Sequence, residues 1–277
     1  MDLTRELMVA RIAGRAAGAE ALRLQSGVET QDKADGSPVS AGDLAADRII
    51  RSAIQQAFPE DAILSEEVTD SAARQSSRRL WIIDPIDGTT NYLRGIPAWA
   101  ISIALCEPRR DGLVPRWGIV YDPTRDEAFT AEDGSGAWCN GKRIYASPCA
   151  RLEDALLASA LPFRFPEHLP ACGRVHLDIA ARCEDHRRGG AASLDLAYVA
   201  AGRLDGYYEL AIWPWDVAAG ELLVRCAGGV ATDYRGGVAG VTTRRSIVAA
   251  GTPELHAQLL AAVAPLAEAA ASLPGPA

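Results

Sequence analysis

The sequence predicts a layered α/β fold, and three observations support that prediction. Two helical stretches open the chain, at about 3–25 and 44–57. A stretch rich in strand-forming residues follows between residues 99 and 131. From about residue 152, apolar strand-like segments alternate with helical segments, which is typical of sheets covered by helices. The chain has 277 residues, 48% of them hydrophobic, so it is long enough to bury a sizeable core.

The first half of the chain is expected to contain two helices and most of one sheet. Apolar runs at 62–65 and 80–84 predict strands, and Gly88 precedes a predicted helix start. Glycine-containing turns at 133–136 and 140–141 indicate the hairpins of an antiparallel sheet. The β-like runs of this sheet cover 99–106, 117–121 and 127–131.

The second half is expected to alternate strands with helices. We expect the chain to divide into an N-terminal half, 1–150, and a C-terminal half, 151–277. The Ala/Pro-rich end at 267–277 is expected to be frayed. The predicted strands cover 155–161, 204–209, 230–233 and 246–250, and the predicted helices cover 175–183, 191–201 and the run that follows Asp216.

Charge and composition exclude several classes of protein. The net charge is −8 and lysine and arginine form no long block, so nucleic acid is not expected as a principal partner. The N-terminus lacks the apolar core of a signal peptide, and no stretch approaches the roughly 18 apolar residues of a membrane span. We therefore expect a cytoplasmic protein with no membrane partner.

The cysteines and histidines show no spacing typical of metal ligands. The six cysteines form no Cys-x-x-Cys pair, which favours reduced structural thiols over disulfides or a zinc site. The four histidines are interpreted as surface or helix residues and not as catalysts. They are His168, His176, His186 and His256.

The most informative segment is 80–91, in which an apolar run leads into two carboxylates, a glycine and two hydroxyls. Pro85 cannot continue an interior strand ladder, so the chain is expected to turn just after Asp84. Gly88 allows close approach to a ligand, and the following threonines suit a helix start, where N–H groups attract phosphate. Two acids beside an anion pocket imply divalent cations such as magnesium between them.

Each acidic residue of interest also has a purely structural explanation. Asp84 and Asp87 could belong to a solvated turn. The glutamate pair at 66–67 ends a short apolar run and could simply face solvent. Asp216 precedes a helical run and could be its N-cap, and Asp43 could be a helix-start carboxylate.

Two motifs make the chain resemble the inositol monophosphatase family of magnesium-dependent phosphatases. Residues 84–91 match the pattern Asp-Pro-x-Asp-Gly-Thr-x-Asn in full, and residues 215–220 match Trp-Asp-x-Ala-Ala-Gly. The glutamate pair at 66–67, a stretch at 33–43 and a substrate-side segment at 187–209 also fit the family. The resemblance covers nearly the whole chain and is closest to the bacterial inositol-1-monophosphatase type.

The resemblance implies a fold and a metal content. The family fold is an αβαβα five-layer sandwich of the inositol monophosphatase and fructose-1,6-bisphosphatase type. Two to three magnesium ions are implied, because one ion can activate water while another stabilises the leaving oxygen. Asp84 would bridge two ions. The implied metal ligands are Glu66, Asp84, the main-chain carbonyl of Ile86, Asp87 and Asp216.

The resemblance also assigns catalytic and substrate-binding residues. Asp43 and Thr89 would form a pair that takes a proton from metal-bound water, because a threonine hydroxyl alone is a poor base. Glu66 would contribute through a third, weaker ion, and Glu209 would accept hydrogen bonds from substrate hydroxyls. Main-chain N–H groups of Gly88 and Thr89 would hold phosphate. The implied substrate-binding residues are Asp87, Gly88, Thr89, Gly190, Ala192, Glu209 and Asp216.

The predicted function is hydrolysis of inositol monophosphate, or of a related polyol or sugar phosphate, by a metal-activated water. Histidinol phosphate, fructose 1,6-bisphosphate and 3'-phosphoadenosine 5'-phosphate are alternative substrates of the same fold. A regulatory binding protein associated with transcription machinery is the alternative of another class. The resemblance further implies a homodimer, inhibition by lithium and a mobile flap at 33–39 near the metals.

Overall fold

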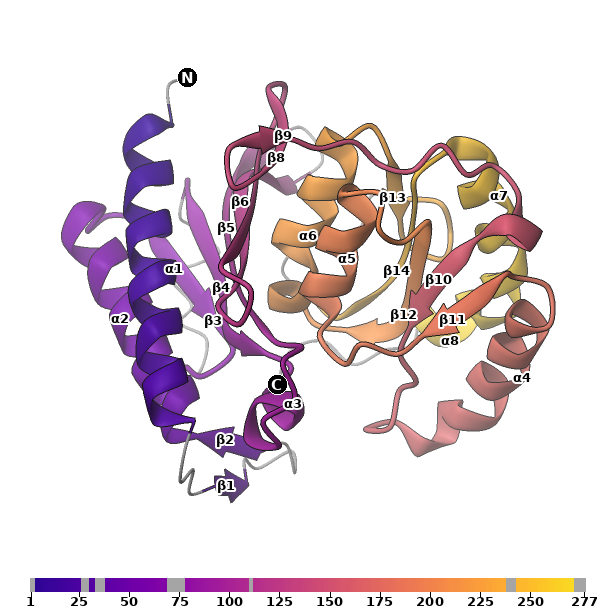
Figure 1. Cartoon of the computed structure of the whole chain (residues 1–277), viewed down its shortest axis with the longest axis horizontal. Coiled ribbons are helices and arrows are strands. Elements are labelled where there is room, and N and C mark those ends of the chain that lie inside the picture. The colour runs from indigo at the N-terminus through magenta and orange to yellow at the C-terminus, as the bar shows by residue number, and fades with distance from the viewer. Residues whose placement is uncertain are drawn as a thin grey trace.

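The computed structural model describes residues 3–25, 30–32, 38–68, 78–109, 112–237 and 243–271. Their elements form five layers in the order helix, sheet, helix, sheet, helix (Figure 1). This arrangement confirms the predicted αβαβα sandwich. Within the described part of the chain, no helix is long and apolar enough to cross a membrane.

Helices α1 (Thr4–Leu24) and α2 (Ala41–Ala57) form the first layer. The face that α1 buries consists mostly of alanine and glycine, so the helix lies close to the neighbouring sheet. A Cβ on Gly18 would lie 2.8 Å from the side chains of Tyr121 and Pro123, which explains why a glycine is needed there. The two helices cover one face of the first sheet.

The second layer is a seven-stranded mixed sheet in the order β3-β4-β5-β6-β7-β8-β9. Strand β4 (Leu80–Asp87) pairs in parallel with β3 (Ala62–Ser65) and antiparallel with β5 (Ala100–Arg109). Trp81 and Ile83 of β4 pack toward α1 and α2, whereas the alternate residues pack toward the middle helices. The remaining strands are β6 (Gly112–Asp122), β7 (Glu127–Glu132), β8 (Gly136–Cys139) and β9 (Lys142–Arg143), and β1 (Thr30–Asp32) pairs separately with β2 (Pro38–Ser40).

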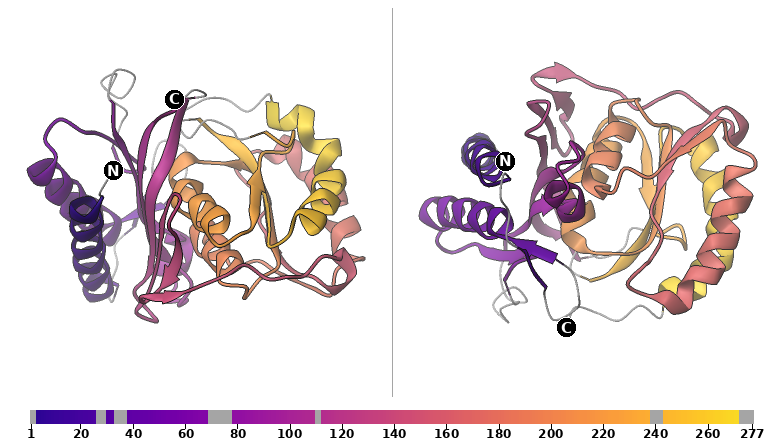
Figure 2. Two further views of the ribbon diagram at one scale, coloured as in Figure 1. Left: turned by 90° about the horizontal axis from the view of Figure 1, so that it is seen from above. Right: turned by 60° about the horizontal axis from the view of Figure 1, so that its bottom comes forward.

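Helices α5 (Ala192–Ala200) and α6 (Pro214–Cys226) lie between the two sheets (Figure 2). Most of the residues of α6 are buried, as expected of a helix with a sheet on both sides. A Cβ on Gly118 of β6 would lie 3.1 Å from the Cα of Ala219, so this glycine allows α6 to approach β6 closely. The middle layer therefore belongs to the cores of both sheets.

The fourth layer is a five-stranded sheet in the order β11-β10-β12-β14-β13, and the fifth layer covers its outer face (Figure 1). The core between these layers contains Leu157, Leu210 and Val248 from the strands and Ile179 and Leu259 from the helices. The strands are β10 (Leu156–Ser159), β11 (Asp185–Arg187), β12 (Gly206–Ile212), β13 (Val230–Thr232) and β14 (Arg245–Ala250), and the main covering helices are α4 (Leu169–Ala180) and α7 (Pro253–Val263).

Strand β4 does not end at Asp84, so the expected turn after this residue is wrong. The strand continues to Asp87, which pairs with Ala100 of β5. The pairing is irregular between Asp84 and Asp87, and Pro85 lies within this irregular stretch. Because no ladder hydrogen bond is required of Pro85 there, its missing N–H is tolerated.

The helices of the fifth layer differ from the prediction. Helix α4 begins at Leu169, six residues before the predicted start, and α7 was not predicted. The start of α7 carries ordinary helix signals, because Thr252 Oγ1 accepts a hydrogen bond from the Leu255 N–H (3.2 Å) and Pro253 occupies the first turn. Those signals could have revealed the helix.

The predicted frayed tail and the predicted flap compare differently with the structure. Residues 267–271 form the short helix α8 (Ala267–Ala271), so the expectation of a frayed tail is wrong for them. Residues 272–277 lie outside the described part of the chain. Most of the predicted flap at 33–39 also lies outside it, and Pro38 and Val39 belong to β2.

Candidate active site

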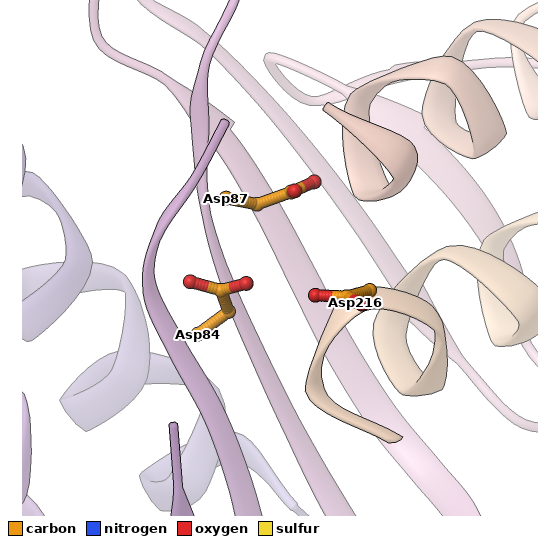
Figure 3. Close-up of side chains that lie close together, drawn as sticks. All are labelled: Asp84, Asp87 and Asp216. Carbon is orange, nitrogen blue, oxygen red and sulfur yellow. The ribbon is translucent and has the colours of Figure 1, made fainter. Parts of the chain in front are cut away.

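Three aspartates from two distant parts of the chain converge at the junction of the layers. Asp84 and Asp87 lie on β4, and Asp216 lies in the first turn of α6. One carboxylate oxygen of each lies within 4.8 Å of the others. Figure 3 shows the three side chains pointing toward a common space. The structure therefore brings these three predicted residues together.

Hydrogen bonds hold each of the three carboxylates in place. Asp84 Oδ1 accepts from the N–H of Ile86 at 3.0 Å, within the irregular part of β4. Asp87 Oδ2 accepts from both the N–H (2.7 Å) and the hydroxyl (2.6 Å) of Ser193, at the start of α5. Asp216 Oδ2 accepts from the N–H of Trp213 at 3.1 Å. The second oxygen of each carboxyl can then face the shared space.

Asp216 is not the N-cap of its helix. Trp213 occupies the N-cap position and Pro214 the first turn, so Asp216 is the third residue of α6. There its carboxylate faces back toward the N-cap N–H. The Ser102 hydroxyl of β5 donates to the carbonyl of Trp215 at 3.0 Å, which fixes the start of α6 against the first sheet.

Burial and mutual repulsion disfavour three charges in this space. Burial raises the pKa of Asp84 and of Asp216 well above the usual range, and the neighbouring carboxylates raise both further. Burial also raises the pKa of Asp87 to about 6, although the hydrogen bonds from Ser193 oppose the shift. A bound cation would remove this penalty by neutralising the charges.

Glu66 lies on the wall of the same cavity but outside the tight aspartate group. It follows β3, and its N–H donates to the carbonyl of Ile83 in β4 at 3.2 Å. Its charge is near enough to raise the pKa of all three aspartates. Glu66 therefore lies near the three aspartates but is not one of the residues whose oxygens lie within 4.8 Å of one another.

Thr89 and Asp43 lie side by side, as predicted. The Thr89 hydroxyl is 3.3 Å from Asp43 Oδ1 and 3.2 Å from the carbonyl oxygen of Ile86, so its single hydrogen has two possible acceptors. Asp43 is fully buried, and its other oxygen accepts from the N–H of Ser40 at 2.9 Å and from the Ser40 hydroxyl. Ser40 is the N-cap of α2, so Asp43 also completes a capping box.

A cavity of about 320 Å³ opens beside the aspartates. This volume is at the lower end of the range typical of small-molecule sites. The cavity is lined by most of the predicted site residues and by an aromatic and basic rim from the segments after β10 and β11. The predicted residues on its wall are Glu66, Asp84, Ile86, Asp87, Gly88, Thr89, Gly190, Ala192, Glu209 and Asp216, and the rim residues are Phe163, Arg164, Phe165 and Arg188.

Gly88 brings the two halves of the cavity together. Its φ is +91°, and a Cβ there would lie 3.1 Å from the Ala191 Cβ and from the carbonyl oxygens of Ala98 and Gly190. A left-handed backbone and this close packing both require glycine. The helix that follows is short, α3 (Thr89–Leu93), so it contributes only one turn of aligned N–H groups.

Sequence reasoning missed several residues that shape the site. Ser193 holds Asp87, and the Asn91 side-chain amide donates to the carbonyls of Ala98 (2.6 Å) and Gly189 (2.8 Å), which joins the two walls. A hydroxyl residue at a helix start was a signal for Ser193. The Tyr207 hydroxyl donates to Glu209, and alternation along β12 could have placed both on one face.

Glu209 and Asp195 add two more acids to the cavity wall. Burial raises the pKa of Glu209 to about 7, while its hydrogen bond with Tyr207 and the charges of Arg188 and Arg164 oppose the shift. Burial raises the pKa of Asp195 to about 8, and the charges of Asp87 and Glu209 raise it further. The carboxyl-rich surface thus extends from the aspartate group to the substrate side.

Known proteins resemble this chain over nearly its full length. The model of the inositol monophosphatase family matches residues 4–268. A protein named "Nus factor SuhB" from Salmonella typhimurium (strain LT2) is 38% identical over 258 residues, 92% of this chain and 94% of the relative. These matches support a phosphatase.

Solved structures agree with this result. The extragenic suppressor protein suhB from Bartonella henselae has a TM-score of 0.85 and 37% identity, covering 94% of this chain and 98% of that one. An inositol monophosphatase from Anabaena has a TM-score of 0.82 and 34% identity, covering 95% and 96%.

Proposed function

Because this chain belongs to the inositol monophosphatase family, we propose that it hydrolyses phosphate monoesters at the aspartate cavity with magnesium, and that inositol monophosphate is its preferred substrate. One observation supports this proposal most strongly. Asp84, Asp87 and Asp216 present oxygens within 4.8 Å of one another beside a cavity with room for a polyol phosphate.

The donor set fits magnesium. All three aspartates offer hard oxygen ligands, and Ile86 and Glu66, which could add a carbonyl and a carboxylate oxygen, lie on the same wall. Asp84, Asp87 and Asp216, with Glu66 and Ile86, would hold two to three ions. Bound there, magnesium would supply a water of lowered pKa and would stabilise the leaving oxygen. Lithium is expected to compete for one of these positions.

Thr89 and Asp43 can move the proton that the attacking water must lose. The Thr89 hydroxyl is placed between Asp43 Oδ1 and the Ile86 carbonyl. If that carbonyl is a metal ligand, the hydroxyl hydrogen is directed to Asp43 instead. Thr89 Oγ1 then presents a lone pair toward the cavity and can accept a proton while donating its own. Ser40 keeps Asp43 oriented for this exchange.

The opposite wall suits a substrate with several hydroxyl groups. Glu209 accepts from Tyr207, which orients its carboxyl, and it lies on the cavity wall with Gly190 and Ala192. A carboxylate readily accepts hydrogen bonds from a polyol. The N–H groups of Gly88 and Thr89 are proposed to hold the phosphate beside Asp87 and Asp216.

A side-by-side assay of phosphate release tests this proposal. Inositol 1-phosphate, histidinol phosphate, fructose 1,6-bisphosphate and 3'-phosphoadenosine 5'-phosphate are compared in magnesium. The highest kcat/KM is expected for inositol 1-phosphate. A higher value for another ester would contradict the substrate assignment, and no magnesium-dependent release from any of them would contradict the function itself.

A second candidate function rests on the names of the relatives. Several similar proteins are named "Nus factor SuhB", so a regulatory association with transcription machinery is the alternative of another class. The two functions do not exclude each other.

A homodimer is also proposed, and sedimentation as a monomer at micromolar concentration would contradict it.

A further inference from the structure

Two histidines that are distant in sequence meet on the side of the second sheet that faces away from the aspartate cavity. His176 lies on α4 and His186 on the edge strand β11, and their ring centroids are 4.5 Å apart. His176 is a helix residue, as expected, whereas His186 lies on a strand, and the sequence did not predict that the two meet. The hydroxyls of Ser159 and Tyr208 complete the group, which we call the histidine cluster.

Strand register places the cluster on one face of the sheet. Leu157 of β10 is paired with His186, and Ser159 is paired with Tyr208 of β12. Since Leu157 and Ser159 are two residues apart, the side chains of Ser159, His186 and Tyr208 share a face. Leu157 and Tyr208 belong to the core under α4, so this face is the one that α4 covers. Tyr207, the next residue, faces the substrate side instead.

The polar atoms of the cluster form a closed ring. Ser159 Oγ lies 3.3 Å from His176 Nδ1 and 3.1 Å from His186 Nε2. Tyr208 Oη lies 3.1 Å and 3.4 Å from the same two nitrogens. The four distances limit how far the atoms can lie from their common centre. Whether the ring is flat or puckered, the root-mean-square distance from the four atoms to that centre is at most about 2.3 Å. Zinc binds imidazole nitrogen at about 2.0–2.1 Å and carboxylate oxygen at about 2.0–2.2 Å.

Hydrogen bonds can give each of the four groups a partner, and Ser159 and Tyr208 also hydrogen-bond to each other, but hydrogen bonds cannot use all four nitrogen–oxygen contacts at once. A neutral imidazole nitrogen either donates once or accepts, and each hydroxyl has one hydrogen. No arrangement of hydrogens on two neutral rings turns all four nitrogen–oxygen contacts into hydrogen bonds. A central cation would use a lone pair from each of the four atoms.

The surroundings keep both imidazoles in the form that binds metals. Burial lowers the pKa of His176 and lowers that of His186 to about 4, and repulsion between the two rings adds to the shift of His186. Neutral imidazole is a metal ligand, whereas imidazolium is not. Both rings are only partly buried, so an ion can reach them from solvent.

We propose that the histidine cluster binds one divalent transition-metal ion of the zinc type, separately from the aspartate cavity. Imidazole nitrogens select zinc, copper or nickel, whereas the carboxylates of the cavity select magnesium. The ion would join α4 to the edge strand β11. Because Arg188 and Gly190 of the cavity wall follow His186 within four residues, a bound ion would also restrain that wall.

Cobalt(II) spectroscopy on the full chain, with excess magnesium to fill the carboxylate cavity, tests the proposal. Four-coordinate cobalt with imidazole ligands absorbs visible light far more strongly than six-coordinate cobalt with oxygen ligands. The wild type is expected to develop an intense band that saturates at one equivalent. The band should be lost in His176→Gln and in His186→Gln and retained in His168→Gln, which lies outside the cluster.

Three outcomes would overturn the proposal. They are the absence of an intense band in the wild type, its persistence in both cluster variants, and its loss in Asp216→Asn, which would place the cobalt in the aspartate cavity. Circular dichroism of each variant shows whether it is folded, and the absence of an intense band in the wild type would contradict the proposal even if a variant is unfolded.

Discussion

Ser193 and Tyr207 act on the site through other residues. Neither side chain is proposed to touch a metal, yet each donates a hydrogen bond to an acid of the cavity: Ser193 to Asp87 and Tyr207 to Glu209. Residues that orient metal ligands typically change metal affinity or activity 10–100-fold when they are replaced. Replacing Ser193 therefore tests metal binding, and replacing Tyr207 tests substrate binding.

Replacing Ser193 with alanine should weaken magnesium binding. Asp87 would keep the N–H donor but lose the hydroxyl donor, so its carboxylate would be less well oriented. We expect about a 10-fold rise in the magnesium concentration needed for half-maximal activity. Ser135→Ala, in the exposed hairpin between β7 and β8, is the matched control. An unchanged magnesium requirement in Ser193→Ala would contradict the role given to this hydroxyl.

Replacing Tyr207 with phenylalanine should affect the substrate and not the metal. Glu209 would lose the donor that orients it, so KM for inositol 1-phosphate should rise several-fold while kcat changes little. Steady-state kinetics at saturating magnesium measures this difference. Tyr145→Phe removes a hydroxyl from an exposed tyrosine and serves as the control. A fall in kcat with KM unchanged would count against the assignment.

Individual elements show where sequence reasoning succeeds and where it fails. The apolar run of β4 and the helical run of α6 were predicted because burial on both sides leaves a clear apolar pattern. The continuation of β4 past Pro85 was not predicted. It depends on an irregular pairing with β5, which no local sequence pattern specifies. Similarly, His176 and His186 meet only because α4 covers the edge of the second sheet.

The proposed metal-ligand residues could be found from motifs, whereas the contacts that hold them in place could not. Asp84, Asp87 and Asp216 stand in recognisable patterns, and the structure brings them together. Ser193 carried a helix-start signal, but the hydrogen bonds of Ser193 and Asn91 cross between segments about 100 residues apart, so only the packing of the layers reveals their partners. The predicted division near residue 150 stays a prediction.

A comparison of two glycines tests how closely the elements must approach at the cavity. Gly88 and Gly95 both have positive φ, but a Cβ on Gly95 would meet no atom within 4 Å. Gly95→Ala should therefore lose only about 1–2 kcal/mol of unfolding free energy, from backbone strain. Gly88→Ala should lose clearly more, because three neighbours at 3.1 Å must move. Urea unfolding measures both, and equal losses would contradict the close-approach argument.

Ions bound in the cavity, as proposed, would help to hold the whole molecule together. Asp84 and Asp87 come from the first sheet and Asp216 from a helix between the sheets, so ions held by all three would join the layers. Without ions, the charges of these carboxylates, of which two are buried and that of Asp216 is partly buried, repel one another. Metal binding and stability should therefore be linked.

This linkage predicts a pH-dependent effect of magnesium on stability. The pKa of Asp87 is raised from 3.8 to about 6 on folding, so its contribution to stability is present below pH 3.8 and lost as pH rises through 6. Asp84 and Asp216 shift in the same direction. Magnesium should thus raise Tm by several degrees at pH 8 and by much less at pH 5, as measured by calorimetry. An equal rise at both values would contradict the linkage.

The most direct test measures magnesium-dependent phosphate release from inositol 1-phosphate by Asp216→Asn. Asp178→Asn is the matched control, because Asp178 is an exposed aspartate of α4. We expect a loss of activity of more than about 100-fold for Asp216→Asn with the fold retained by circular dichroism, and wild-type activity for Asp178→Asn. Retention of most activity by Asp216→Asn, with the magnesium dependence of the wild type, would contradict the proposal that Asp84, Asp87 and Asp216 together hold the catalytic metal.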